Sequence, residues 1–146
     1  MVETTGMVKD LRVLVTAGAS GIGLAIAQTF AREGAQLHIC DISEEALTDC
    51  AIAHPDWGIT NCDVSQEVQV AQLFEDVSRQ MGGLDVLINN AGIAGQTGSI
   101  EELSSDKWHQ TIDINLNGQF YCARLAVPML KQSDNASIIC LSSVAG

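Results

Sequence analysis

A glycine-rich turn at residues 16–23 has the composition of an anion-binding loop. It reads Thr-Ala-Gly-Ala-Ser-Gly-Ile-Gly and joins an apolar run to a segment with helical spacing. Glycines let the backbone approach a ligand, and the next helix start offers unpaired N–H groups and partial positive charge. The turn, with glycines at positions 18, 21 and 23, is therefore expected to hold a phosphate. The glycine spacing differs from G-x-G-x-x-G, so a turn that binds nothing is the alternative.

An acidic residue, Asp41, ends the next apolar run, Leu-His-Ile-Cys-Asp at 37–41. A carboxylate at the end of a second strand can accept hydrogen bonds from a ribose 2′-hydroxyl and repels a 2′-phosphate. Asp41 therefore favours NAD over NADP as the cofactor. The alternative is an acid that only precedes a helix starting at Ser43.

The elements that must position these residues alternate between strand and helix. Expected strands cover residues 11–16, 36–40, 58–61, 84–89 and 137–141, and expected helices cover 22–32, 43–51, 65–80 and 104–131. Several strands are apolar at consecutive positions, which is typical of parallel strands covered on both faces. The pattern predicts an α/β fold with a doubly wound parallel sheet of about five strands. Ser43, Ser65 and Ser104 are the expected helix N-caps.

Composition narrows the class of protein. The chain has 146 residues, 47% hydrophobic and 4% aromatic, which suits one domain, spanning residues 1–146, with an aliphatic core. A net charge of −11 argues against nucleic acid and anionic membranes as partners. No apolar stretch is long enough to cross a membrane and no secretory signal is evident, so we expect a soluble, cytoplasmic protein.

The cysteines and histidines do not suggest a metal site. The five cysteines lack a Cys-x-x-Cys pair, and three of them lie in apolar runs, so we expect buried free thiols. The three histidines, His38, His54 and His109, lie far apart without ligand spacing.

Five motifs in order make the sequence resemble the short-chain dehydrogenase/reductase family, from about residue 11 to residue 146. Besides the turn at 16–23, they are Asp-Val at 63–64, Asn-Asn-Ala-Gly at 89–92, Asn115 within Ile-Asp-Ile-Asn-Leu, and Ser-Ser at 142–143. The resemblance implies a Rossmann-type fold. It also implies that Gly18, Ser20, Gly21, Ile22 and Gly23 contact the cofactor pyrophosphate. It further implies that Asp63 and Val64 contact adenine and that Asn90, Ala91 and Gly92 border the cofactor ribose. For 89–92 the alternative is a plain turn.

The same resemblance implies two residues at the reaction centre. Ser143 would bind the substrate's carbonyl or alcohol oxygen, and Asn115 would hold a water that relays protons. The alternatives are a strand-end hydroxyl satisfied by the backbone for Ser143 and a locally bonded helix residue for Asn115.

The sequence departs from the family in three places. The family's Tyr-x-x-x-Lys, which follows its serine, is missing: Tyr121 precedes Ser143 and has Leu125 four residues on, so we expect Tyr121 to be a packing residue. The sequence stops at Gly146, which we interpret as a truncation, since residues 137–141 would otherwise form an apolar edge strand. Ala17 stands where the family usually has glycine, and it is tolerable only if its φ is negative.

These observations predict an NAD(H)-dependent oxidoreductase that moves a hydride between nicotinamide and a secondary alcohol or ketone, with the 146-residue chain itself inactive. Alternatives are a non-catalytic NAD-binding module and a flavodoxin-like or receiver-type domain. The loop at 93–99 is expected beside the substrate. The resemblance implies a homodimer or homotetramer for the intact protein.

Overall fold

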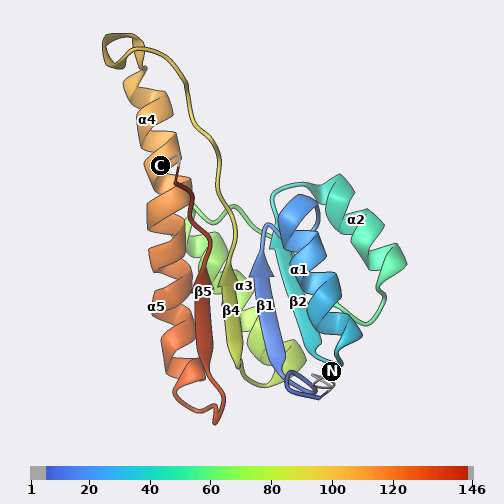
Figure 1. The fold of residues 1–146 in the computed structure, drawn as a ribbon. Helices are drawn as coiled ribbons and strands as arrows, with labels where there is room; N and C mark the ends of the chain where they lie inside the picture. The colour runs from blue at the N-terminus through green and yellow to red at the C-terminus, as the bar shows by residue number, and fades with distance from the viewer. Residues whose placement is uncertain (1–5, 145–146) are drawn as a thin grey trace.

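The computed structural model describes residues 6–144, which form five strands with helices on both faces of the sheet (Figure 1). The strands are β1 (Arg12–Thr16), β2 (Gln36–Asp41), β3 (Gly58–Asn61), β4 (Val86–Asn89) and β5 (Ser137–Cys140). The helices are α1 (Gly21–Arg32), α2 (Glu44–Ala53), α3 (Glu67–Met81), α4 (Ser105–Ile112) and α5 (Gly118–Leu130), with a 3₁₀ turn at Ile100–Glu102 and a π turn at Asp113–Asn117.

All neighbouring strands are parallel, in the order β3-β2-β1-β4-β5. Consecutive residues of β1 face opposite sides: Val13 and Val15 pack with the core under α1 and α2, and Leu14 packs with the core under α3 and α5. The consecutive apolar positions in the sequence reflect this double burial. The prediction of a Rossmann-type, doubly wound sheet is confirmed.

Two of the three expected N-caps are confirmed. The hydroxyl of Ser43 accepts from the backbone N–H of Ala46, and that of Ser104 accepts from the N–H of Lys107. The expectation for Ser65 is wrong, because α3 begins after Gln66. The Ser65 hydroxyl instead donates to Asp63 Oδ1 at 2.7 Å, so it does not cap the helix.

The expected helix at 104–131 contains a π turn that the sequence did not reveal. Helical structure is continuous from α4 to α5, but residues 113–117 adopt the wider i→i+5 turn. Tyr121 on α5 packs partly buried against the core, as expected. Within residues 6–144, no helix has both the length and the apolar character needed to cross a bilayer.

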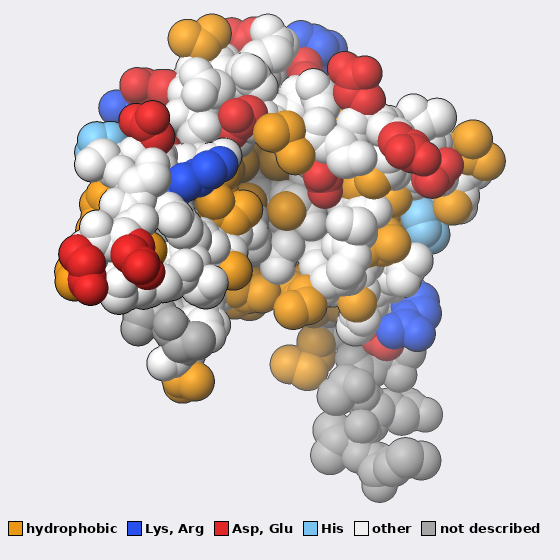
Figure 2. Space-filling view, turned by 90° about the horizontal axis from the view of Figure 1, so that it is seen from above, with side chains coloured by type: hydrophobic (Ala, Val, Ile, Leu, Met, Phe, Trp, Pro, Cys, Tyr) orange, Lys and Arg blue, Asp and Glu red, His pale blue; other side chains and the backbone are white. Residues whose placement is uncertain are grey.

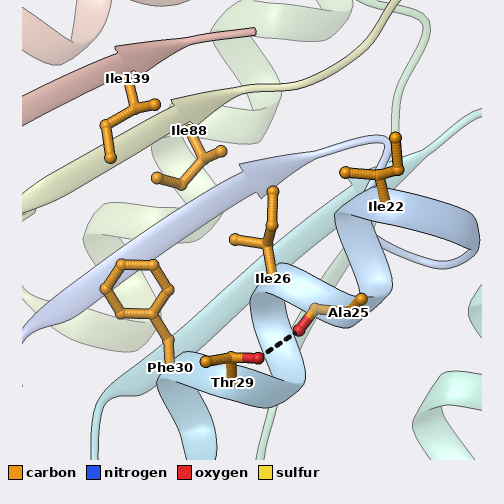
Figure 3. Close-up of a pocket in the computed structure, with 7 residues that line it drawn as sticks. All are labelled: Ile22, Ala25, Ile26, Thr29, Phe30, Ile88 and Ile139. Atoms are coloured by element: carbon orange, nitrogen blue, oxygen red, sulfur yellow. Dashed lines mark hydrogen bonds between the residues drawn. The ribbon is translucent and has the colours of Figure 1, made fainter.

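The α1 side of β4 and β5 is open. Isoleucines 88 and 139 point from these strands toward Ile26 and Phe30 of α1, and together they border an apolar hollow of about 460 Å³ (Figure 3). On the opposite face, α5 contacts both strands. The outer strand β5 is consequently exposed, with Ile139 at 47% and Cys140 also exposed. The expectation of buried cysteines is therefore wrong for Cys140 and confirmed for the other four.

An ion pair fixes the amino ends of β1 and β4. Asp85 Oδ2 accepts from both the backbone N–H and Nε of Arg12, at 2.8 and 2.9 Å, and Oδ1 accepts from the other guanidinium nitrogen at 3.0 Å. The Ser133 hydroxyl, in the turn before β5, donates to Oδ1 at 2.6 Å. These hydrogen bonds hold the pKa of Asp85 well below its usual range, so one carboxylate joins three strands.

We predict that Asp85→Asn lowers the free energy of unfolding by about 2 kcal/mol at neutral pH, measured by urea denaturation. Because the pKa of Asp85 is depressed in the folded state, its stabilisation is present above about pH 4 and is lost as pH falls further. The difference between wild type and variant should therefore shrink below about pH 4. Asp49→Asn, at an exposed position on α2, is the control; an equal loss there would contradict the assignment.

Candidate cofactor site

The first turn of α1 presents backbone N–H groups at the carboxyl edge of the sheet. Ser20 is the N-cap residue with extended backbone, and the first helical bond runs from Leu24 N–H to Ser20 O. No acidic residue lies in this turn, whereas α2, α3 and α4 each begin with one. The partial charge of α1 is therefore not neutralised by its own side chains, which suits an anion.

Two glycines of the loop have no room for a side chain. A Cβ on Gly23 would lie 2.1 Å from the carbonyl oxygen of Ala17, and one on Gly18 would lie 2.8 Å from the Ile39 side chain. Gly21 has a φ of 54° and open space around it. The loop thus combines close packing against β2 with an exposed rim formed by Ser20, Gly21 and Ile22.

Ala17 adopts a φ of 49°, in the left-handed region. This is the costly case that the sequence left open, because a Cβ in that region is unfavourable by about 1–2 kcal/mol. The carbonyl of Ala17 accepts from the side chain of Asn90 at 3.2 Å. The strained residue is therefore held by the turn after β4.

Thr16 and Asn90 join the turns that follow β1 and β4. The Thr16 hydroxyl accepts from the backbone N–H groups of Asn90 and Ala91, both at 3.0 Å. In return, Asn90 Nδ2 donates to the carbonyls of Thr16 and Ala17. The sequence analysis predicted Asn90 as a site residue but did not predict Thr16. The feature that could have identified Thr16 is its hydroxyl at the buried end of the central strand.

Asp41 lies at the end of β2 beside the glycine loop. Its Oδ2 accepts from the N–H of Ala19 at 3.2 Å and its Oδ1 from the N–H of Ser43 at 3.1 Å. The residue is 9% exposed. Asp41 therefore precedes α2 and is also a fixed hydrogen-bond acceptor in the candidate site. The two interpretations of Asp41 from the sequence, an acid before a helix and an acceptor for a ribose, are compatible.

A cavity of about 120 Å³ adjoins Asp41 and brings together most of the remaining predicted residues. Those lining it are Asp41, Asp63, Val64, Ala91 and Gly92, joined by Ala17, Ile42, Cys62, Ile93 and Ile114. Oδ1 of Asp63 accepts from both the N–H and the hydroxyl of Ser65, which orients the carboxylate. Figure 2, seen from above, shows apolar side chains in the hollows of this edge, with acidic side chains around them.

The polar and apolar groups at this edge of the sheet fit a dinucleotide. The helix start and close-packed glycines suit phosphates, Asp41 suits a hydroxyl-bearing ribose, and the mainly apolar cavity suits a flat ring. Among the described residues, no group of three or more His, Cys, Asp or Glu side chains could hold a metal ion.

Asn115 lies in the π turn and clamps the strand-like segment after β4. Its Oδ1 accepts from the N–H of Ile93 and its Nδ2 donates to the Ile93 carbonyl, both at 2.8 Å. Further along, residues 93–96 and α4 border a hollow of about 720 Å³, next to the loop expected beside the substrate. Ser143 follows β5 at the same edge and is exposed. Ile93 was not among the predicted site residues.

Comparison with known proteins gives the family. The short chain dehydrogenase family model matches residues 11–146. A 3beta-hydroxysteroid dehydrogenase of Mediterraneibacter gnavus is 41% identical over 92% of this chain and 50% of its own length. A 2-dehydro-3-deoxy-L-rhamnonate dehydrogenase (NAD(+)) of Sphingomonas sp. is 37% identical over 91% of this chain and 53% of its own.

Among solved structures, the ligand-free aldohexose dehydrogenase of Thermoplasma acidophilum matches with a TM-score of 0.79 and 33% identity. The match covers 90% of this chain and 48% of that one. The chain therefore belongs to the short-chain dehydrogenase/reductase family. It spans about half the length of the relatives it matches.

We predict that Ala17→Gly raises the free energy of unfolding by about 1 kcal/mol, because glycine adopts the left-handed region without the Cβ penalty. Urea denaturation measures the change. Ala27→Gly, in the buried interior of α1, should instead lower stability by about 1 kcal/mol. A loss in both variants would show that the φ of Ala17 carries no strain.

Proposed function

We propose that this edge of the sheet binds NAD(H) and forms the cofactor half of an oxidoreductase acting on a secondary alcohol or ketone. The observation that carries the proposal is the joint placement of the α1 first turn and the Asp41 carboxylate, linked through the Ala19 N–H. Family membership supports it, since several relatives are named as dehydrogenases.

Local charge supports NAD rather than NADP. The carboxylate of Asp41 is fixed at the end of β2 beside the glycine-rich turn, where we propose that the adenine ribose binds, and Glu44 and Glu45 follow at the start of α2. Neither residues 17–23 nor residues 41–46 contain Lys or Arg. A second phosphate would therefore meet negative charge without a compensating cation.

Ser143 and Asn115 are the residues we propose at the reaction centre. When bound, nicotinamide supplies or accepts the hydride. The Ser143 hydroxyl would donate to the substrate oxygen and hold it in place. Asn115 already uses one lone pair and one N–H on Ile93, so it would position the relay water with its remaining polar capacity or through its π turn.

Proton transfer is the step that this chain does not provide for. Its one tyrosine, Tyr121, packs against the core on α5 and forms a ring contact with Phe120. A proton acceptor must reach the substrate oxygen, and Tyr121 is not among the residues that line the two cavities of the candidate site. We propose that the chain binds cofactor but turns over little or no substrate by itself.

Self-association of the intact protein is a further part of the proposal. The α4 to α5 segment exposes four large apolar side chains, Trp108 at 57%, Leu116 at 61%, Phe120 at 55% and Val127 at 37%. Exposed apolar groups along one helical segment support a subunit interface. The proposed assembly is a homodimer or homotetramer.

A non-catalytic dinucleotide-binding module is the second candidate function. The packing of Tyr121 against the core favours this candidate. A binding module needs the phosphate loop (residues 16–23) and Asp41, but it needs no proton donor. The two candidates differ in turnover and not in cofactor binding.

Calorimetric titration of the chain with NAD, NADP and FMN tests the cofactor assignment. We expect NAD to bind at least about tenfold more tightly than NADP, and Asp41→Asn to bring that ratio near one, because the variant no longer carries the charge facing the 2′-phosphate. Asp56→Asn, in the exposed turn before β3, should leave the ratio unchanged. Preference for FMN, or equal binding of NAD and NADP by wild type, would contradict the proposal.

Turnover is tested by incubating the chain with NAD and a panel of secondary alcohols while following NADH absorbance. We expect no rate above that of the Ser143→Ala variant, since the chain offers no placed proton acceptor. A rate typical of dehydrogenases, about 1–1,000 s⁻¹, that falls in Ser143→Ala would overturn the expected inactivity while supporting the role of Ser143.

A further inference from the structure

Three of the buried cysteines gather in the core beneath the cofactor site. Cys40 on β2, Cys62 just after β3 and Cys122 on α5 belong to the same cluster of buried side chains under α3 and α5. Cys50 lies in the other core, on α2, and Cys140 is exposed on β5. The phosphate loop, Asp41 and the reaction centre proposed above make no use of these thiols.

The sheet register places Cys40 and Cys62 on the same face and next to each other. Cys40 is paired with Thr60 in the parallel ladder, so Cys62 is its diagonal neighbour two residues on. His38 and Thr60 are diagonal neighbours in the same way, two residues earlier on each strand. Their side chains are in contact, with His38 Nε2 2.9 Å from the Thr60 hydroxyl. The ladder continues to Cys62, whose N–H donates to Asp41 O at 3.0 Å.

The two thiols are chemically unequal. The neighbouring Cys40 thiol lowers the pKa of Cys62, whereas Cys62 and burial both raise the pKa of Cys40. Burial raises the pKa of Cys122 to about 12. Cys62 lines the cavity of about 120 Å³ and Cys40 does not, so Cys62 is the member that a reagent in the cavity reaches and Cys40 is the partner beside it.

Each cysteine of the pair also touches a part of the cofactor site. Cys62 lines the 120 Å³ cavity together with Asp41 and Asp63. The backbone carbonyl of Cys40 accepts from the N–H of Gly18, in the glycine-rich turn at 16–23, at 3.0 Å. Any movement of the two sulfurs therefore reaches both the phosphate loop and the cavity.

We propose that a hydroperoxide entering this cavity oxidises Cys62, that Cys40 resolves it to a Cys40–Cys62 disulfide, and that the disulfide weakens dinucleotide binding. The last part rests on the proposed function.

The steps balance without another reactant. The Cys62 thiolate attacks the terminal peroxide oxygen, the O–O bond breaks, and Cys62 becomes a sulfenic acid while the leaving oxygen takes up a proton. The Cys40 sulfur then attacks the Cys62 sulfur, losing its proton and displacing the hydroxyl as water. Two thiols are oxidised by two electrons, and one hydroperoxide is reduced to water and an alcohol, or to two waters when the oxidant is hydrogen peroxide.

A covalent S–S bond brings the sulfurs closer than a non-bonded contact does, so the ends of β2 and β3 must shift. The hydrogen bond from Gly18 N–H to the Cys40 carbonyl changes with them. Dinucleotide bound over the cavity would also shield Cys62, so NAD should slow the oxidation.

Peptide mapping tests the cross-link without reference to cofactor binding. The Cys140→Ser variant, which removes the exposed thiol, is treated with stoichiometric hydrogen peroxide, alkylated and digested on the amino side of aspartates. This digestion leaves Cys40, Cys50, Cys62 and Cys122 in four different peptides, 10–40, 49–55, 56–62 and 113–133. We expect peptides 10–40 and 56–62 to be joined and to separate after dithiothreitol. A Cys62–Cys122 link, or unmodified Cys62, would overturn the proposal.

Calorimetry with NAD then tests the consequence. Oxidation should raise the NAD dissociation constant about tenfold, and dithiothreitol should restore it. Cys40→Ser should lose this response, whereas the matched variant Cys50→Ser, also at a buried thiol, should keep it. If reduced protein does not bind NAD, the proposed function fails while the cross-link can still stand. If it binds NAD and oxidised protein binds equally well, the inhibitory role fails.

Discussion

The Thr16 hydroxyl is the contact on which the candidate site depends. It is 1% exposed and makes three hydrogen bonds, accepting from Asn90 and Ala91 and donating to the carbonyl of Ile88. A hydroxyl has one donor and two acceptor positions, so its capacity is fully used. This single group holds the turn after β1 against the turn after β4, at the point where the strand order reverses and a ligand crevice forms.

The strain at Ala17 is a consequence of that junction. Ala17 keeps a positive φ while its carbonyl accepts from Asn90 and lies directly against Gly23. The surrounding hydrogen bonds compensate for the backbone strain at Ala17, which is about 1–2 kcal/mol. In a chain of net charge −11, the anion binding that we propose for this turn would thus rest on local geometry and not on long-range attraction.

The sequence predicted the strands well because burial on two faces leaves a plain signal, as in Val13, Leu14 and Val15. It also identified Asp41 and Asp63 as strand-end acids. It could not give the role of Ser65, because the choice between capping α3 and bonding to Asp63 is decided by turn geometry. Nor could it reveal the π turn, since α and π helices share similar apolar spacing, and Asn115 meets Ile93 only in the folded chain.

The order of strands in space differs from their order in the chain, and this bears on how the sheet is completed during synthesis. β1 is made first and lies in the centre, with β2 and β3 added on one side. Its other edge pairs Val13 with Val86, so that edge stays unsatisfied until α2, β3 and α3 have all been translated. The central strand is therefore closed by a late, non-local pairing, which is the slowest kind of contact to form.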